Sequence, residues 1–196
     1  MSTLALIVVD VQADFCHGGS LEVRNGDDIV PLLNPVIRAF DRLAAPIFFT
    51  RDWHPPHHIS FKERGGEWPP HCVQGTPGAE FHPGLLVPRG ATVISKGDDP
   101  NKEAYSGFQG TDLEALLRAR GVGETVIGGL ATEYCVKESS LDAMRAGFTV
   151  YLMEDCVRPV DLGLGDGKRA LQQLVKSGAR LTSSRDAIAR VARAQQ

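Results

Sequence analysis

The sequence contains no apolar run near the roughly 20 residues that a membrane-spanning helix needs. It also has no basic excess, because 21 Lys and Arg stand against 24 Asp and Glu, for a formal net charge of −3. A nucleic-acid-binding domain or a polybasic membrane anchor would carry a positive patch. The apolar run 4–9 has no basic segment before it and ends at Asp10, which is unlike a secretory signal. We therefore expect neither nucleic acid nor a membrane as a partner.

Cysteine is scarce and widely spaced: the four are Cys16, Cys72, Cys135 and Cys156. No pair has the C-x-x-C spacing of a zinc knuckle. Nothing in the composition indicates an oxidising compartment, so reduced thiols and a cytoplasmic location are expected. Two interpretations stay open, namely four thiols buried as small hydrophobic side chains, or one of them acting as a nucleophile.

What the sequence does contain is an alternation of apolar runs and helical patterns. A length of 196 residues with 42% hydrophobic residues fits one domain over 1–196. The expected strands cover 4–9, 45–50, 91–95, 125–130, 148–153 and 179–182. The expected helices cover 29–43, 111–120, 135–145 and 168–176. This order predicts an α/β fold with a mostly parallel sheet of about six strands, covered by helices on both faces in a three-layer, Rossmann-like α/β/α arrangement.

Polar residues follow several of the expected strands. Because ligands bind at the carboxyl ends of parallel strands, we expect these residues to share one edge of the sheet. They are Asp10, Asp52, His54, Lys96 and the segment 131–135. The pattern predicts an active site at that edge.

The stretch 51–90 is too long for an ordinary strand–helix connection. It holds five of the six histidines, both tryptophans and seven of the 12 prolines, a composition that argues against disorder. Asp52 and His54 point to the same side of an extended segment, and His58 and His71 lie nearby in sequence. An aspartate with two or three histidines suits zinc, iron or manganese. We expect a metal and substrate loop here, with His57 and His82 as surplus histidines.

Cys135 follows a glycine-rich strand exit and begins a helical pattern. Backbone N–H groups at a helix N-terminus favour a thiolate and can stabilise an oxyanion, so Cys135 is a candidate nucleophile. Asp10 is a candidate base, although a histidine is not excluded from that role, and Lys96 could stabilise negative charge. Aromatic walls for a flat pocket are candidates among Phe15, Trp68 and Tyr105, which could equally be ordinary packing residues.

Five segments taken together resemble one family. They are VVDVQADFCHGGSL, TRDWHPPHHISF, WPPHCVQGTPGAEFHP, ISKG…AYSGF and GLATEYCV. The sequence is similar, from about Leu4 to Val157, to the nicotinamidase (pyrazinamidase) branch of the isochorismatase-like cysteine hydrolases. The DWH…WPPHC combination is the more specific part, because other branches generally lack it. Ala13 stands where the family usually has Asn.

The resemblance implies a set of roles for individual residues. It implies a catalytic triad of Asp10, Lys96 and Cys135, and an oxyanion hole built from the backbone N–H groups of Ala131 and Cys135. It implies a cis peptide bond between Leu130 and Ala131. It implies metal binding by Asp52, His54 and His71, with His58 a ligand in some members only, and a substrate pocket formed by Phe15, Trp68, Tyr105 and Leu130.

The implied reaction is hydrolysis of nicotinamide to nicotinate and ammonia through a thioester, with pyrazinamide as a second substrate and a place in NAD salvage. A sister amidase acting on a carbamoyl or maleamate-type substrate would keep the triad without needing the metal ligands. Isochorismate hydrolysis would not require Cys135, and a non-catalytic metal-binding protein would not require the triad. The sequence leaves open whether the protein forms a homo-oligomer.

Overall fold

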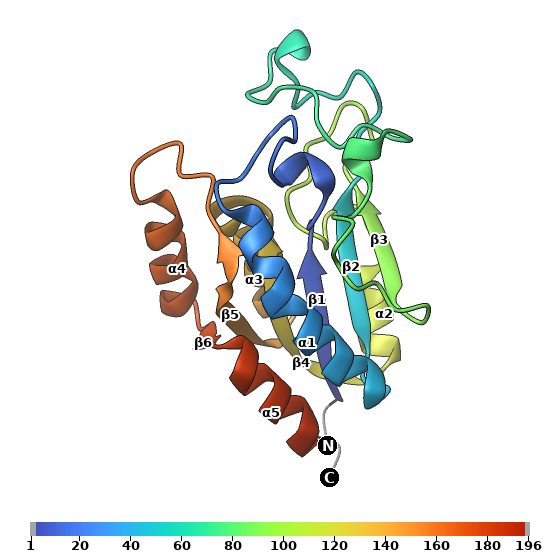
Figure 1. The fold of residues 1–196 in the computed structure, drawn as a ribbon, viewed down its shortest axis with the longest axis vertical. Helices are drawn as coiled ribbons and strands as arrows, with labels where there is room; N and C mark the ends of the chain where they lie inside the picture. The colour runs from blue at the N-terminus through green and yellow to red at the C-terminus, as the bar shows by residue number, and fades with distance from the viewer. Residues whose placement is uncertain (1–2, 195–196) are drawn as a thin grey trace.

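A computed structural model describes residues 3–194 (Figure 1). Its centre is a sheet in the order β3-β2-β1-β4-β5-β6, with every neighbouring pair parallel. The strands are β1 Thr3–Val9, β2 Ile47–Asp52, β3 Thr92–Lys96, β4 Val122–Leu130, β5 Thr149–Arg158 and β6 Arg180–Thr182. The α-helices are α1 Val30–Arg42, α2 Leu113–Ala119, α3 Lys137–Arg145, α4 Asp166–Lys176 and α5 Ser184–Ala194. The predicted α/β class and six-stranded parallel sheet are confirmed.

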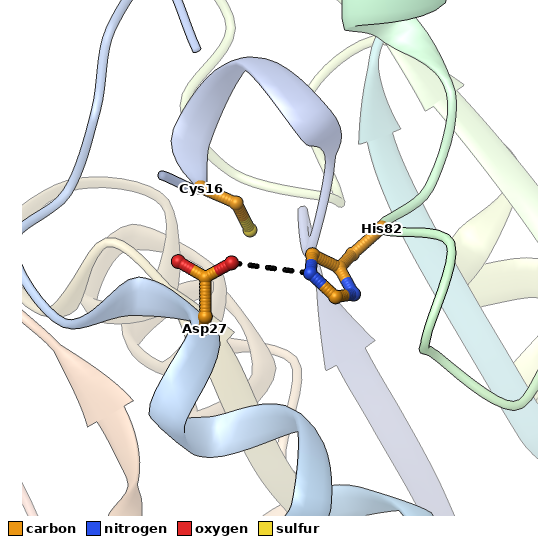
Figure 2. A group of neighbouring side chains, drawn as sticks. All are labelled: Cys16, Asp27 and His82. Atoms are coloured by element: carbon orange, nitrogen blue, oxygen red, sulfur yellow. Dashed lines mark hydrogen bonds and ion pairs between the residues drawn. The ribbon is translucent and has the colours of Figure 1, made fainter. Parts of the chain in front are cut away.

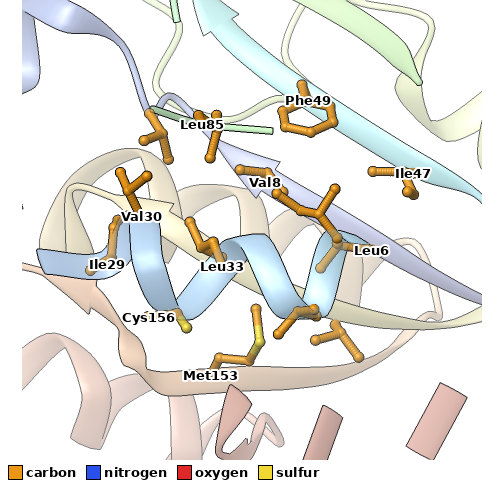
Figure 3. Close-up of a cluster of buried hydrophobic side chains, with 14 of the residues drawn as sticks. Leu6, Val8, Ile29, Val30, Leu33, Ile47, Phe49, Leu85, Met153 and Cys156 are labelled. Carbon is orange, nitrogen blue, oxygen red and sulfur yellow. The ribbon is translucent and has the colours of Figure 1, made fainter. Parts of the chain in front are cut away.

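Two hydrophobic cores lie on the two faces of the sheet. Alternate residues of β1 point to opposite faces, so Leu6 and Val8 join one core while Ile7 joins the other. Helices α1 and α5 cover the first face, and α2, α3 and α4 cover the second. Figure 3 shows α1 against the first face, with Leu33 packed over the strands. Because both faces are buried, β1 needs the continuous apolar run that its sequence has.

Helix α1 buries a stripe of residues at helical spacing, namely Leu33, Val36, Ile37 and Phe40. Pro31 occupies its first turn, where a missing N–H costs nothing. Pro35 lies inside the helix without ending it. The predicted helix 29–43 is therefore present with nearly the predicted ends.

One helical prediction needs correction, and one helix of the structure was not predicted. The helix expected over 135–145 is instead a π-helical turn, Thr132–Val136, followed by α3, so Cys135 precedes the α-helix rather than beginning it. Helix α5 was not predicted, because its buried residues are few and small, with Ala187 and Val191 facing the core among charged neighbours. Strand β5 also runs five residues beyond the expected 148–153, as far as Arg158.

Most of the stretch 51–90 lies above the carboxyl ends of the strands, and its last residues run down to the amino end of β3 (Figure 1). It contains short 3₁₀ turns at Lys62–Arg64 and Pro77–Ala79, and isolated bridges join His54 to Val73 and Phe61 to Trp68. Two further 3₁₀ turns, Ala13–Phe15 and Gly26–Ile29, connect β1 to α1. No helix in residues 3–194 is both long enough and apolar enough to cross a membrane.

Candidate active site

Asp10, Lys96 and Cys135 meet at the carboxyl edge of the sheet, although they are far apart in sequence. Asp10 follows β1, Lys96 is the last residue of β3, and Cys135 lies in the turn after β4. Lys96 Nζ is 2.9 Å from Asp10 Oδ2 and 3.4 Å from Cys135 Sγ. All three side chains are buried. The structure thus brings together the three residues expected to form the triad.

Asp10 is held in an unusual backbone conformation, with φ of 48° in the left-handed region that non-glycine residues seldom adopt. Its Oδ1 accepts a hydrogen bond of 2.6 Å from Thr50 Oγ1, and its backbone N–H donates to the Thr50 carbonyl. Burial raises the pKa of Asp10 above its usual value, although the nearby Lys96 ammonium opposes this. A carboxyl group with a raised pKa can accept a proton and return it near neutral pH.

The protonation state of Cys135 differs from the sequence-based expectation. Burial raises the pKa of its thiol well above the usual value, and Lys96 offsets this only in part. Burial is the largest cause, and the nearby carboxylates of Asp10 and Asp52 raise the pKa further. The resting group is therefore a thiol, whose proton must be removed during attack.

A second group at this edge consists of Asp52, His54 and His71, whose ligand atoms all lie within 4.8 Å of one another. The Nδ1 atoms of His54 and His71 lie 2.9 and 2.8 Å from the carbonyls of Gly97 and Pro69. Because a carbonyl only accepts, each Nδ1 carries the proton and each Nε2 keeps a free lone pair. Despite burial, Lys96 holds the pKa of Asp52 far below its usual range, so this carboxylate is ionised. The donor set fits a divalent transition metal.

Gly97 is needed at its position in this group. A Cβ atom there would lie 2.5 Å from Cε1 of His54, and the residue has φ of 66°. Only glycine combines that close approach with this backbone conformation. The carbonyl of Gly97 can therefore reach and orient the His54 ring.

His58 is not grouped with the expected ligands. Its ring stacks on His54 at 4.1 Å between centroids, while its Nε2 lies 2.9 Å from the Lys102 carbonyl and its Nδ1 lies 2.7 Å from Ser60 Oγ. The carbonyl requires a proton on Nε2, so Nδ1 is the acceptor for the Ser60 hydroxyl. Both nitrogens are occupied, and His58 supports the His54 ring by packing.

A narrow cavity opens beside both groups. Its lining is mainly aromatic and aliphatic, and Asp52, His71 and Cys135 face into it: the lining residues are Phe15, Leu21, Asp52, Trp68, His71, Tyr105, Ala131, Tyr134, Cys135 and Val160. Trp68 Nε1 donates a hydrogen bond of 2.9 Å to Tyr105 Oη, which fixes two walls relative to each other. Tyr134 packs edge-on against Trp68, with 5.0 Å between the ring centroids.

Leu130 does not line this cavity, contrary to the prediction. Its side chain is fully buried in the core, where Cδ1 lies near Gly26. The peptide bond that joins Leu130 to Ala131 is cis, as the resemblance implied. Ala131 itself does line the cavity, and so does Cys135, which places their backbones beside the bound molecule's expected position.

Several residues that support the site were not predicted. Gln12 bonds both the N–H and the carbonyl of Asp52, each at 2.8 Å, and thereby fixes the end of β2. Thr50 orients Asp10, and Tyr134 and Val160 add walls to the cavity. For these supporting residues the sequence offered one signal. Thr50 lies in the strand just before Asp52, and therefore at the same edge of the sheet as the expected site residues.

Comparisons with known proteins give a consistent result. Residues 4–186 match the family described as Isochorismatase domain. The nicotinamidase of Acinetobacter baylyi is 38% identical over 204 residues, covering 93% of this chain and 93% of the relative. The nicotinamidase/pyrazinamidase of Mycobacterium tuberculosis is 41% identical over 164 residues, covering 77% of this chain and 84% of the relative.

A solved structure is also similar in fold. The pyrazinamidase of Pyrococcus horikoshii, determined in complex with zinc, superposes with a TM-score of 0.88 and 52% identity. The match covers 92% of this chain and 98% of that protein.

Proposed function

The chain belongs to the isochorismatase family and is an amide hydrolase, and on that premise we propose that it converts nicotinamide to nicotinate and ammonia. The observation that carries the proposal is the joint position of two groups. A buried Asp10–Lys96–Cys135 cluster and a donor set of Asp52, His54 and His71 lie beside one aromatic cavity, which Cys135, Asp52 and His71 line. A flat ring with a carboxamide on one side and a ring nitrogen on the other suits such a cavity.

The reaction begins with the thiol of Cys135. Asp10 takes the thiol proton as Sγ attacks the carboxamide carbon, which forms a tetrahedral intermediate with a negative oxygen. The backbone N–H groups of Ala131 and Cys135 stabilise that oxygen. Asp10 then gives the proton to the leaving nitrogen, so that ammonia departs and a thioester remains. Water, deprotonated by Asp10, hydrolyses the thioester, the proton passes from Asp10 to Cys135, and nicotinic acid leaves and loses its own proton to solvent to give nicotinate.

Lys96 keeps its charge throughout this sequence. Its pKa is held well above the usual value, because Asp10 and Asp52 outweigh the cost of burial. Its Nζ also donates a hydrogen bond of 3.1 Å to the Ala104 carbonyl, and this bond fixes the ammonium between the carboxylates and the sulfur. We assign Lys96 the role of stabilising the negative charge that develops on the thiolate.

Asp52, His54 and His71 would hold one divalent ion of zinc, iron or manganese. When bound, the ion would supply a Lewis acid that accepts the ring nitrogen and so fixes the ring's orientation. Phe15, Trp68 and Tyr105 then hold the ring from its faces and edge. Since the substrate is a neutral amide, no charged residue is needed to attract it.

The same chemistry suits pyrazinamide, whose ring and carboxamide have the same arrangement. Further proposals follow from the family: one domain spanning the chain, a cytoplasmic location and a role in NAD salvage. The proposed binding partner is a small-molecule substrate.

The test is an ammonia-release assay with nicotinamide, pyrazinamide and two aliphatic amides, each with and without a chelator. We expect hydrolysis of the two ring amides and a rise in KM after chelation. Preference for aliphatic amides would favour a maleamate-type amidase instead. Activity that is unchanged after complete metal removal would overturn the metal's proposed role.

A further inference from the structure

A second group of metal-ligating side chains lies outside the cavity and outside the mechanism. Cys16, Asp27 and His82 offer a sulfur, a carboxylate oxygen and an imidazole nitrogen, all within 4.8 Å of one another. Cys16 directly follows the 3₁₀ turn Ala13–Phe15, Asp27 lies in the turn before α1, and His82 lies in the stretch 51–90. Figure 2 shows the three side chains converging from these separate segments.

The carboxylate of Asp27 is already oriented. Its Oδ2 accepts a hydrogen bond of 2.8 Å from the backbone N–H of His17, and its Oδ1 lies 3.1 Å from His82 Nε2. The side chains of Asp27 and His82 are 39% and 20% exposed, whereas Cys16 is only 3% exposed. An ion can therefore approach from solvent past Asp27 and His82, with the sulfur at the inner end.

The charges around Cys16 favour a cation. Burial, followed by the carboxylates of Asp27 and Glu22, raises the pKa of the Cys16 thiol to about 12. A neutral thiol beside two carboxylates makes a poor nucleophile. A bound divalent ion reverses this effect, since it attracts the carboxylate and deprotonates a coordinating thiol.

We propose that Cys16, Asp27 and His82 form a second transition-metal site that binds Zn²⁺, separate from the group of Asp52, His54 and His71. Thiolate, imidazole and carboxylate are the three ligand types that zinc takes in proteins, in tetrahedral geometry. Three protein ligands leave one position for water. The ion would join three chain segments immediately beside Phe15, which is a wall of the substrate cavity.

The protons that must move when the metal binds limit the affinity of this site. On binding, the Cys16 thiol proton leaves to solvent as the sulfur–metal bond forms. His82 Nδ1 now accepts a hydrogen bond of 3.0 Å from the Gly84 N–H, so the ring proton is on Nε2. Binding through Nε2 moves that proton to Nδ1 and breaks the Gly84 bond. Because the Gly84 hydrogen bond is lost and only three side chains bind the ion, the ion exchanges with solvent and is not a permanent structural ion.

Co²⁺ is the probe, because a thiolate bound to Co²⁺ gives a near-ultraviolet charge-transfer band that nitrogen and oxygen ligands do not give. The parent protein for the titration is Cys135→Ala, which removes the thiol that lies near Asp52. We expect the band to form in this parent and to disappear when Cys16→Ser is added. Adding Cys156→Ser instead, which changes a buried thiol outside the group, should leave the band intact.

A second variant keeps the test sharp if Cys16→Ser alters folding. His82→Gln retains a side-chain N–H for Asp27 but cannot bind the metal in the same way, and should weaken Co²⁺ binding at this site by about tenfold or more. Absence of the band in the Cys135→Ala parent would overturn the proposal. So would a band that persists without Cys16, or His82→Gln binding Co²⁺ as tightly as the parent.

Discussion

Lys96 and Asp52 form a buried ion pair with 2.5 Å between Nζ and Oδ1. The same ammonium lies 2.9 Å from Asp10 Oδ2, so one cation serves a carboxylate of the catalytic cluster and a carboxylate of the metal-binding group. One positive charge beside two negative charges leaves this buried region with a net negative charge. That excess favours a divalent cation beside Asp52 and helps to raise the pKa of Asp10.

Lys96→Met should therefore destabilise the protein as well as inactivate it. The substitution leaves two buried carboxylates without a counterion, and breaking a buried pair in this way costs about 3–5 kcal/mol. Urea unfolding of the metal-free protein measures the loss. The matched control is Lys102→Met, since Lys102 is exposed and, within residues 3–194, its ammonium pairs only with the surface residue Asp99, so that its loss should cost under about 1 kcal/mol. Equal unfolding midpoints for the two variants would contradict the argument.

Cys135→Ala should reduce ammonia release at least about a thousandfold, as removal of a nucleophile does in other hydrolases. The fold should be retained, because alanine fits where the thiol was and Lys96 keeps its two carboxylate partners. The control is Cys156→Ala, which removes a fully buried thiol in the core beside Met153 (Figure 3) and should keep its activity while losing about 1 kcal/mol of stability. An active Cys135→Ala enzyme would exclude Cys135 as the nucleophile.

His54→Ala and His58→Gln should separate a metal ligand from a supporting residue. His54→Ala removes one of three donors, so metal content should fall and KM should rise more than kcat falls. His58→Gln should retain the metal, because both nitrogens of His58 already bond Lys102 and Ser60, and glutamine keeps a donor for the Lys102 carbonyl. Elemental analysis of the purified variants gives the answer. Loss of metal from His58→Gln would mean that His58 becomes a ligand on binding.

The fold could be predicted where sequence and burial agree. Strand β1 is buried on both faces and is continuously apolar, so its type and place were clear. Helix α5 was missed because its core face is made of small residues, and it is stabilised in the fold by packing against α1. The π-helical turn that carries Cys135 was not visible either, since nothing in TEYCV distinguishes it from an ordinary helix start.

Part of the candidate site could be predicted from the sequence for a similar reason. Residues that end parallel strands must share an edge, so the nearness of Asp10 and Lys96 follows from topology. The hydrogen bonds of His58 depend on how the loop at Lys102 returns to it, which no local pattern records. Leu130 shows that a place at the sheet edge does not by itself put a side chain in the cavity. Its neighbour Ala131 lines the cavity, while the side chain of Leu130 points into the core.

Trp68→Phe should weaken substrate binding with little effect on chemistry. The substitution removes the indole N–H that holds Tyr105 Oη at 2.9 Å, a bond worth about 1 kcal/mol, so KM should rise about fivefold while kcat stays nearly constant. Tyr105→Phe removes the same bond from the other side. If the bond is what matters, the double variant should show clearly less than the sum of the single effects on KM. Fully additive effects would show that each ring contributes only by its own contact.

Glu133→Gln should change how stability depends on pH. Glu133 Oε1 accepts a hydrogen bond of 2.7 Å from the Asp161 N–H, which holds the segment with the cavity residue Val160, while Oε2 is buried with no hydrogen-bond partner in residues 3–194. Burial raises the pKa of Glu133 above its usual value of 4.5. The folded state therefore binds this proton more tightly than the unfolded state does, and the wild type loses stability as pH rises from the unfolded pKa through the folded one.

The amide that Glu133→Gln introduces cannot titrate, so this variant should gain stability relative to the wild type as the pH rises above about 4.5, the pKa of this group in the unfolded chain. Urea unfolding at several pH values measures this difference. Glu133→Ala is the matched control, because it also cannot titrate but leaves the Asp161 N–H without an acceptor, and it should be less stable than Glu133→Gln by about 1–2 kcal/mol throughout. A difference in stability between Glu133→Gln and the wild type that stays constant, or falls with rising pH, would show that Glu133 is ionised as readily in the folded protein as in the unfolded chain.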